Sequence, residues 1–195
     1  MNMEIKIENV KAAFNTADES GKKLLLALFP ELSSETAQKA DNRPVTERIK
    51  TFEDAARAMG INDPEAWEDN YSNLEPDILA YFKLRIICAA LNEGWKPQFT
   101  ENEWRYYPWF WLYTQDEIDN MDEDEKKERR LMSTGDYQTG YAGLAYAYSS
   151  YAPSSSNSST YFGSRLCLKS DTLAVYAGKQ FMSLWADFYL IRKSK

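Results

Sequence analysis

The sequence predicts an α+β fold: N-terminal helices around a central buried helix, a small antiparallel sheet of about three strands, and a C-terminal helix. Two observations support this. Residues 76–93 are apolar over more than one helical face. From residue 104 onward the composition changes to aromatic segments that are typical of strands. We expect a single domain over residues 1–195, in which residues 1–45 form a loosely attached helical part.

Two short amphipathic segments open the chain. Residues 9–15 and 19–29 carry apolar side chains at helical spacing, and the second segment ends at a Phe-Pro pair. Residues 33–45 carry Ser, Thr, Asn and Pro, which are typical of a loop. The N-terminal part is therefore expected to be two short helices followed by a loop.

Local capping signals predict the next two helices. Thr51 and Asp54 have the Ser/Thr-x-x-acid spacing of a capping box, and Gly60 stands where a helix C-terminal cap belongs. Asp63 followed by Pro64 is typical of an N-cap with proline at the first helical position.

The central helix is predicted over residues 76–93. Pro76 starts it and Gly94 ends it. Its apolar positions cover too much of the circumference for a surface helix, so the rest of the fold should pack against it. These positions are Ile78, Leu79, Tyr81, Phe82, Leu84, Ile86, Ile87, Cys88 and Leu91.

Three segments have strand composition: residues 104–113, 140–151 and 160–168. Pro108 restricts the first segment to an edge strand or a bulge, because proline cannot donate a ladder hydrogen bond. The polar residues 152–159 between the other two are expected to be a mobile hairpin loop. A recognition loop, with Ser supplying adaptable contacts, is the alternative interpretation.

A final helix is predicted after this hairpin. Ser170 or Asp171 can cap it, and its apolar residues recur at helical spacing. They are Leu173, Ala177, Phe181, Leu184, Trp185 and Phe188.

Alternation divides the aromatic strand into two faces. One face carries Tyr107, Trp109, Trp111 and Tyr113, and the other carries Trp104, Tyr106, Phe110 and Leu112. One face is expected to pack on the central helix. The other needs a cover, which can be another element of the chain, a partner subunit or a ligand.

The composition argues against several kinds of chemistry. The chain contains no histidine, which removes the commonest general base and metal ligand. No glycine-rich phosphate loop is present, and nothing in the sequence selects a catalytic pair among the carboxylates. The net charge of -7 argues against duplex DNA as a partner, since that binding needs a basic surface. We therefore expect a protein that is not an enzyme and has no cofactor.

Metal and thiol chemistry are not expected either. The acidic run over residues 116–128 lacks the spacing of a calcium loop, because Lys126 stands at the fifth position counted from Asp122. Cys88 and Cys167 lie in apolar patterns and are interpreted as small buried hydrophobic residues.

The N-terminus shows no secretory leader pattern, and the longest apolar run, residues 24–29, is far too short to span a membrane. From this pattern we expect a cytoplasmic protein without a membrane partner.

Several sequence stretches resemble a family of proteins from phages and prophages of gut Bacteroidales bacteria, for which no activity is established. The stretches are residues 46–55, 84–95, 106–113, 163–166 and 176–181, and the resemblance extends over about residues 10 to 188. The resemblance implies that the protein acts inside a bacterial host cell or within a virion. It assigns no role to any residue.

The sequence thus favours a non-enzymatic binding or assembly protein that contacts another protein or a second copy of itself. The competing hypothesis is a single-stranded nucleic-acid binder with stacking aromatic rings and basic groups. A hydrolase that uses two carboxylates is a third. In the first hypothesis the aromatic sheet and the Tyr/Ser-rich hairpin contact the other protein. In the second, Tyr107, Trp109 and Trp111 are the stacking surfaces, and Arg165 and Lys169 supply the charge.

Overall fold

The structure is a computed structural model that describes residues 7–29, 43–98, 100, 102–152 and 163–194. The chain divides into two compact units, Met1–Arg43 and Pro44–Lys195, here called the N-terminal unit and the main unit. Each is described by itself. The predicted loop 33–45 lies largely outside the described residues, as do residues 153–159 of the predicted hairpin loop.

The described part of the N-terminal unit is a pair of helices, α1 (Ile7–Thr16) and α2 (Glu19–Leu28). They confirm the two short helices expected there. Asp18 caps α2, because its carboxylate accepts a hydrogen bond of 2.8 Å from the backbone N–H of Gly21.

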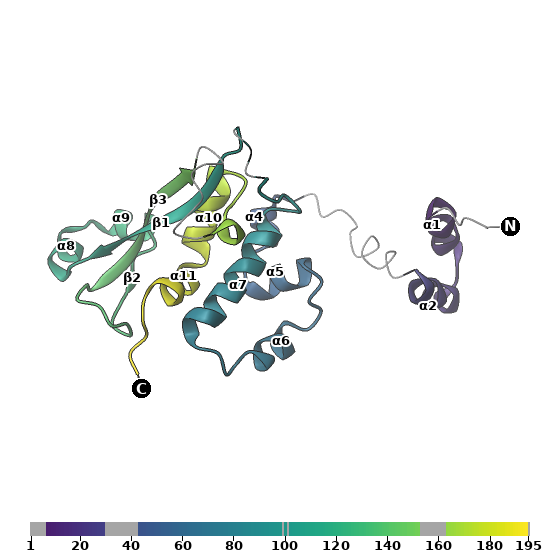
Figure 1. The fold of residues 1–195 in the computed structure, drawn as a ribbon, viewed down its shortest axis with the longest axis horizontal. Helices are drawn as coiled ribbons and strands as arrows, with labels where there is room; N and C mark the ends of the chain where they lie inside the picture. Colours follow the sequence, from purple (N-terminus) through teal and green to yellow (C-terminus); the bar gives the residue numbers. More distant parts are fainter. Residues whose placement is uncertain (1–6, 30–42, 99, 101, 153–162, 195) are drawn as a thin grey trace. The chain divides into compact units, whose positions relative to one another are not determined.

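The main unit combines helices with a small three-stranded antiparallel sheet and has a C-terminal helix, so the predicted fold class is confirmed (Figure 1). Its elements are α4 (Val45–Arg48), α5 (Phe52–Ala58), α6 (Pro64–Asn70), α7 (Pro76–Leu91), β1 (Arg105–Tyr113), α8 (Gln115–Asn120), α9 (Glu123–Glu128), β2 (Met132–Ser133), β3 (Gly143–Ala152), the 3₁₀ turn η1 (Ser164–Leu166), α10 (Asp171–Gln180) and α11 (Met182–Tyr189).

The capping residues found in the sequence set the ends of α5 and α6. Thr51 Oγ1 accepts a hydrogen bond from the N–H of Asp54, whose carboxylate accepts one from the N–H of Thr51. Gly60 follows α5 with a φ of 83°, the left-handed conformation that glycine adopts without strain. Asp63 caps α6, and Pro64 occupies its first turn.

α7 is the buried helix of the main unit. Leu84, Ile87, Cys88 and Leu91 have no exposed surface. α5 and α11 pack against α7, which explains why its apolar residues cover more than one face. Its first turn reaches the surface, where Ile78 is 40% exposed.

Many of the aromatic side chains form one continuous series of ring contacts through the core. Neighbouring ring centroids lie 4.7 to 6.2 Å apart along this series, distances that are typical of favourable aromatic pairs. The members in order are Phe52, Trp67, Tyr71, Phe82, Tyr81, Phe188, Trp185 and Phe110.

The strand order of the sheet is β1-β3-β2. β1 therefore lies at an edge of the sheet, and the register shifts next to Pro108, between Trp109 and Phe110. Both features agree with what proline predicts in a strand. The sequence did not indicate β2, because a strand of two residues carries no alternating pattern.

The predicted third strand, residues 160–168, is wrong over its described part. Ser164–Leu166 form η1, and only Leu168 joins the sheet, as an isolated bridge to Tyr106. Two hydrogen bonds of 3.0 and 2.9 Å connect these two residues. The chain turns instead of extending because Gly163, with a φ of 65°, leads directly into η1.

The predicted final helix is two helices, since α10 and α11 are separated at Phe181. The apolar spacing does not reveal the break, because Phe181 remains buried on the same side as Trp185. The indole N–H of Trp185 reaches back across the break and donates to the Ala177 carbonyl at 3.1 Å.

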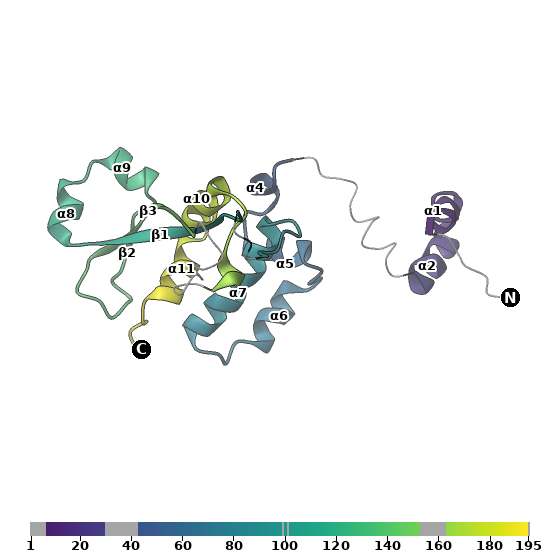
Figure 2. The same ribbon diagram turned by 45° about the horizontal axis from the view of Figure 1, so that its top comes forward.

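α10 lies beside the strands β1 and β3, and α11 lies beside α7 (Figures 1 and 2). The aromatic strand was predicted to pack on residues 76–93, and the two meet in one hydrophobic core to which α10 and α11 also contribute. The strand joins the shared core through Tyr106 and Phe110.

Candidate functional site

Phe110, Leu112 and Tyr106 of β1 contact the helical core, as alternation predicts for that face. The opposite face carries Tyr107, Trp109 and Trp111, which differ in burial. Tyr107 is 3% exposed and belongs to the interior, Trp109 is half-buried, and Trp111 is 49% exposed. Of these three aromatic candidates, Trp111 is the one most accessible to a partner.

Tyr148 of β3 completes the exposed aromatic surface. It lies opposite Trp109 in the register, and the two rings stack at 6.0 Å with an interplanar angle of 15°. The Trp111 ring is 6.4 Å from the same tyrosine ring, which is 47% exposed. Trp109, Trp111 and Tyr148 are here called the outer aromatic face.

A bulge in β3 places Tyr148 on this face. Trp109 pairs with Tyr148 and Phe110 pairs with Tyr146, so Ala147 has no opposite residue in the ladder. Simple alternation would give Tyr146 and Tyr148 the same face. Because of the extra residue, Tyr146 is buried, 5% exposed, while Tyr148 is open to solvent. Tyr148 could not be predicted as a site residue from the sequence, because the position of a bulge is set by pairing between distant strands.

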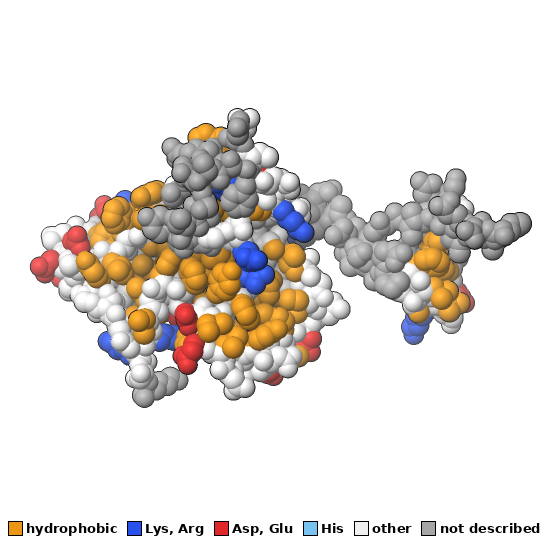
Figure 3. Space-filling view, viewed as in Figure 1, with side chains coloured by type: hydrophobic (Ala, Val, Ile, Leu, Met, Phe, Trp, Pro, Cys, Tyr) orange, Lys and Arg blue, Asp and Glu red, His pale blue; other side chains and the backbone are white. Residues whose placement is uncertain are grey.

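One end of the outer face is covered by the chain itself. Gly143 lies opposite Tyr113, and a Cβ atom at Gly143 would come within 2.8 Å of Ile118 and 2.9 Å of Leu131. α8 and α9 follow β1 here, and residues 116–130 contain eight acids and four bases. The aromatic rings are thus followed by an acidic segment. In Figure 3 hydrophobic side chains gather over the region of β1 and again over α7.

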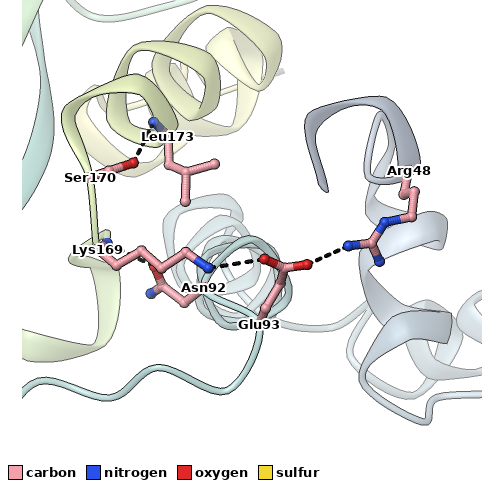
Figure 4. Close-up of polar contacts among 6 residues, drawn as sticks. All are labelled: Arg48, Asn92, Glu93, Lys169, Ser170 and Leu173. Carbon is pink, nitrogen blue, oxygen red and sulfur yellow. Dashed lines mark hydrogen bonds and ion pairs between the residues drawn. The ribbon is translucent and has the colours of Figure 1, made fainter. Parts of the chain in front are cut away.

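The two basic candidates do not extend the outer aromatic face. Arg165 is exposed in η1. Lys169 donates from Nζ to Glu93 at 3.0 Å, and the same carboxylate pairs with Arg48 (Figure 4). The hydrogen bond from Lys169, with the Arg48 contact, holds the pKa of Glu93 below its usual value despite partial burial. The ammonium group of Lys169 is therefore engaged in an ion pair with Glu93 inside the main unit.

Asn92 fixes the segment that carries Lys169. Asn92 is 5% exposed, and its side-chain amide donates to the Cys167 carbonyl at 2.8 Å and accepts from the N–H of Lys169 at 2.9 Å. Ser170 then caps α10 by accepting from the N–H of Leu173 (Figure 4). Residues of this cluster connect the end of α7 to the start of α10.

A pocket of about 440 Å³ lies where α9 meets β3 and α10. Lys179 contributes a cation, with its Nζ 5.3 Å from the centre of the Tyr146 ring. Two of the lining acids already hold α9 together: Asp122 caps it, and Glu125 pairs with Arg129 at 2.8 Å. Part of the acidic lining of the pocket is therefore already used to stabilise α9.

Both cysteines are buried and unpaired with each other. Burial raises the pKa of the Cys88 thiol, and burial likewise raises the pKa of Cys167 to about 11. Both are therefore thiols near neutral pH. Within the part of the chain that the structure describes, no group of three or more Cys, Asp or Glu side chains is arranged to hold a metal ion.

Comparison of the chain with protein-family models, curated protein sequences and solved structures finds no match. Among the described helices, none has the length and apolar character needed to cross a membrane. The candidate site therefore rests on the chain's own geometry, an antiparallel strand pair that presents tryptophan and tyrosine side chains to solvent.

Proposed function

We propose that this chain is a non-enzymatic protein-binding or assembly protein of a phage or prophage, acting in the host cell or in the virion. The outer aromatic face is its contact surface. The observation that carries the proposal is the adjacent pair Trp111 and Tyr148, both about half exposed on a hydrogen-bonded strand pair. Tryptophan and tyrosine are enriched at the energetic centres of protein interfaces.

The neighbouring charges indicate the chemistry of the partner. The acidic segment of α8 and α9 directly follows β1, so a complementary surface carries apolar side chains for the rings and basic side chains for the carboxylates. Because the rings are held on paired strands, binding orders few side chains, which reduces its entropic cost.

Single-stranded nucleic acid is a second candidate ligand, favoured only by the stacked rings of Trp109 and Tyr148. The acidic segment beside them repels phosphate, and Lys169 is already paired with Glu93. We therefore place it second.

The test compares wild type with Trp111→Ser, Tyr148→Ser and the control Ile191→Ser, whose 69% exposed side chain lies outside the sheet. Each protein is used to isolate partners from host-cell extract, and any partner is then purified and titrated. We expect wild type and control to bind equally, and each ring variant to bind at least about tenfold more weakly.

Equal binding by the ring variants, or no partner for wild type, overturns the proposal. Titration with labelled single-stranded oligonucleotides at low and moderate salt separates the second candidate. Tight, salt-sensitive binding that Trp111→Ser abolishes would assign the face to nucleic acid instead.

A further inference from the structure

β1 has an outer edge, on the side away from β3. Tyr106 shows which residues face this edge, because its backbone N–H and C=O both bond to Leu168 there. The backbone groups of successive strand residues point alternately to the two sides of a strand. The bulge lies in β3, so the alternation along β1 is uninterrupted, and the backbone groups of Phe110 and Leu112 face the same outer edge as those of Tyr106.

The outer edge is open beyond Leu168. β1 is the outermost strand of the sheet, and among the described residues no other backbone group pairs with this side of it. Phe110 and Leu112 therefore each offer one N–H donor and one C=O acceptor, at the regular spacing of a strand. A row of such groups is a template for a further strand.

The composition of β1 does little to protect this edge. Native edge strands are commonly shielded by charged side chains, proline or bulges. Here the proline occupies position 108 only, the bulge lies in β3, and residues 109–113 are Trp, Phe, Trp, Leu and Tyr, without a charge. Aromatic residues pair well across neighbouring strands, so an extended segment at this edge gains side-chain contacts as well as backbone hydrogen bonds.

The orientation of Leu168 and the position of α8 indicate the chemistry of such a segment. The bridge between Leu168 and Tyr106 is antiparallel, like the pairing of β1 with β3. A segment added in the same orientation begins beside the end of β1, where Asp116 and Glu117 are exposed in the first turn of α8. Charge complementarity therefore favours basic side chains at its amino end.

We propose that the partner adds an extended segment antiparallel to the outer edge of β1. The backbone groups of Phe110 and Leu112 hold this segment, one of its apolar side chains lies beside Trp111, and basic side chains at its amino end lie beside α8. The proposal rests on the proposed function, because Trp111 belongs to both contact surfaces. It identifies the partner by a strand-forming segment with a basic amino end.

Amide hydrogen exchange of the full chain, read residue by residue by NMR, tests the pairing. The probe is a short synthetic peptide with lysines at its amino end followed by alternating valine and threonine. In the free chain the amides of Phe110 and Leu112 should exchange fast, while the amide of Trp111, which points toward β3, should be protected. Saturating peptide should slow exchange at Phe110 and Leu112 by at least about tenfold.

Three results overturn the proposal. The peptide does not bind, it binds without slowing exchange at Phe110 and Leu112, or these two amides are already protected in the free chain. The last result would mean that the edge is paired before any partner arrives.

Two matched peptides test the backbone bonds and the charge separately. In one, the amides that face β1 are N-methylated, which removes their hydrogen bonds and leaves the side chains unchanged. In the other, glutamate replaces lysine. Each should bind at least about tenfold more weakly than the original peptide at low salt. Equal affinity of the N-methylated peptide overturns the proposal, and equal affinity of the glutamate peptide overturns its choice of a basic partner.

A variant of the chain tests where the basic end lies. Asp116→Asn should weaken binding of the lysine peptide about twofold. The control is Asp69→Asn, which makes the same change at an exposed position of α6, outside the sheet, and should bind as wild type does. Equal affinities of the two variants contradict an amino end beside α8.

A partner isolated through the outer aromatic face separates this proposal from the proposed function. If that partner needs Trp111 and Tyr148 but leaves exchange at Phe110 and Leu112 unchanged, the proposed function holds and the edge proposal fails. If Trp111→Ser and Tyr148→Ser bind the partner as wild type does, the proposed function itself fails.

Discussion

Gly178 of α10 lies directly against the ring of Tyr146 in β3. A Cβ atom at Gly178 would come within 2.7 Å of the tyrosine ring and equally close to the Pro108 Cβ. The helix therefore reaches the sheet at this point only because residue 178 has no side chain. The same contact explains why α10, rather than α7, covers the inner face of the strands.

Gly178→Ala is expected to destabilise the main unit. Alanine is a better helix former than glycine by about 1 kcal/mol. Overpacking against a buried ring and a proline costs about 1–3 kcal/mol, so the net effect should be a loss of up to about 2 kcal/mol. Urea unfolding followed by tryptophan fluorescence measures it.

The control for this substitution is Gly140→Ala, where an added Cβ would meet no atom within 4 Å. Its free energy of unfolding should stay within about 0.5 kcal/mol of wild type. If Gly178→Ala matches this control, the close approach of helix and sheet is not a constraint on stability.

Glu93→Gln is expected to lower stability at neutral pH and to have no effect in acid. Lys169 and Arg48 hold the pKa of the Glu93 carboxyl below its ordinary value, so its ion pairs stabilise the fold above about pH 4.5. That contribution disappears as the pH falls through the folded-state pKa. Because the carboxylate is 43% exposed, the loss at pH 7 should stay below about 1 kcal/mol.

Denaturant unfolding at pH 7 and near pH 3 measures this difference. Glu128→Gln is the matched control, since Glu128 is the last residue of α9, Glu93 lies just beyond the end of α7, and the two substitutions change the charge equally. The control should not lose stability at pH 7. A Glu93→Gln deficit that persists unchanged in acid would show that the charge is not its cause.

The helix boundaries were predictable because their signals are local. Thr51 with Asp54, and Asp63 with Pro64, form complete caps within a few residues of sequence. The aromatic strand was equally predictable, since the alternation of side chains and the effect of Pro108 both act within one segment. These features need no knowledge of the distant chain.

The features that could not be predicted from the sequence are those that tertiary pairing decides. Leu168 joins the sheet through one bridge to Tyr106, 62 positions earlier in the chain, while the residues just before it turn. Lys169, predicted as a binding residue, pairs with Glu93 across a similar separation. The bulge that exposes Tyr148 likewise depends on the register with β1. Pattern within a segment cannot indicate such partners.

Tyr146→Phe is expected to separate from wild type only at alkaline pH. Burial, together with the nearby charge of Asp171, raises the pKa of Tyr146 to about 12. The unfolded chain ionises at about pH 10, so wild-type stability is intact below that pH and falls as the pH rises toward 12. Phenylalanine fills the same space without an ionisable hydroxyl. The free energy of unfolding of the variant should therefore differ from that of wild type by at most about 1 kcal/mol at pH 7, and the variant should be the more stable protein near pH 11.

Tyr148→Phe, on the exposed face, makes the same chemical change as a control and should follow the wild-type pH profile. Denaturant midpoints between pH 7 and 11.5 measure all three proteins, and parallel profiles for wild type and Tyr146→Phe would contradict a buried, protonated Tyr146.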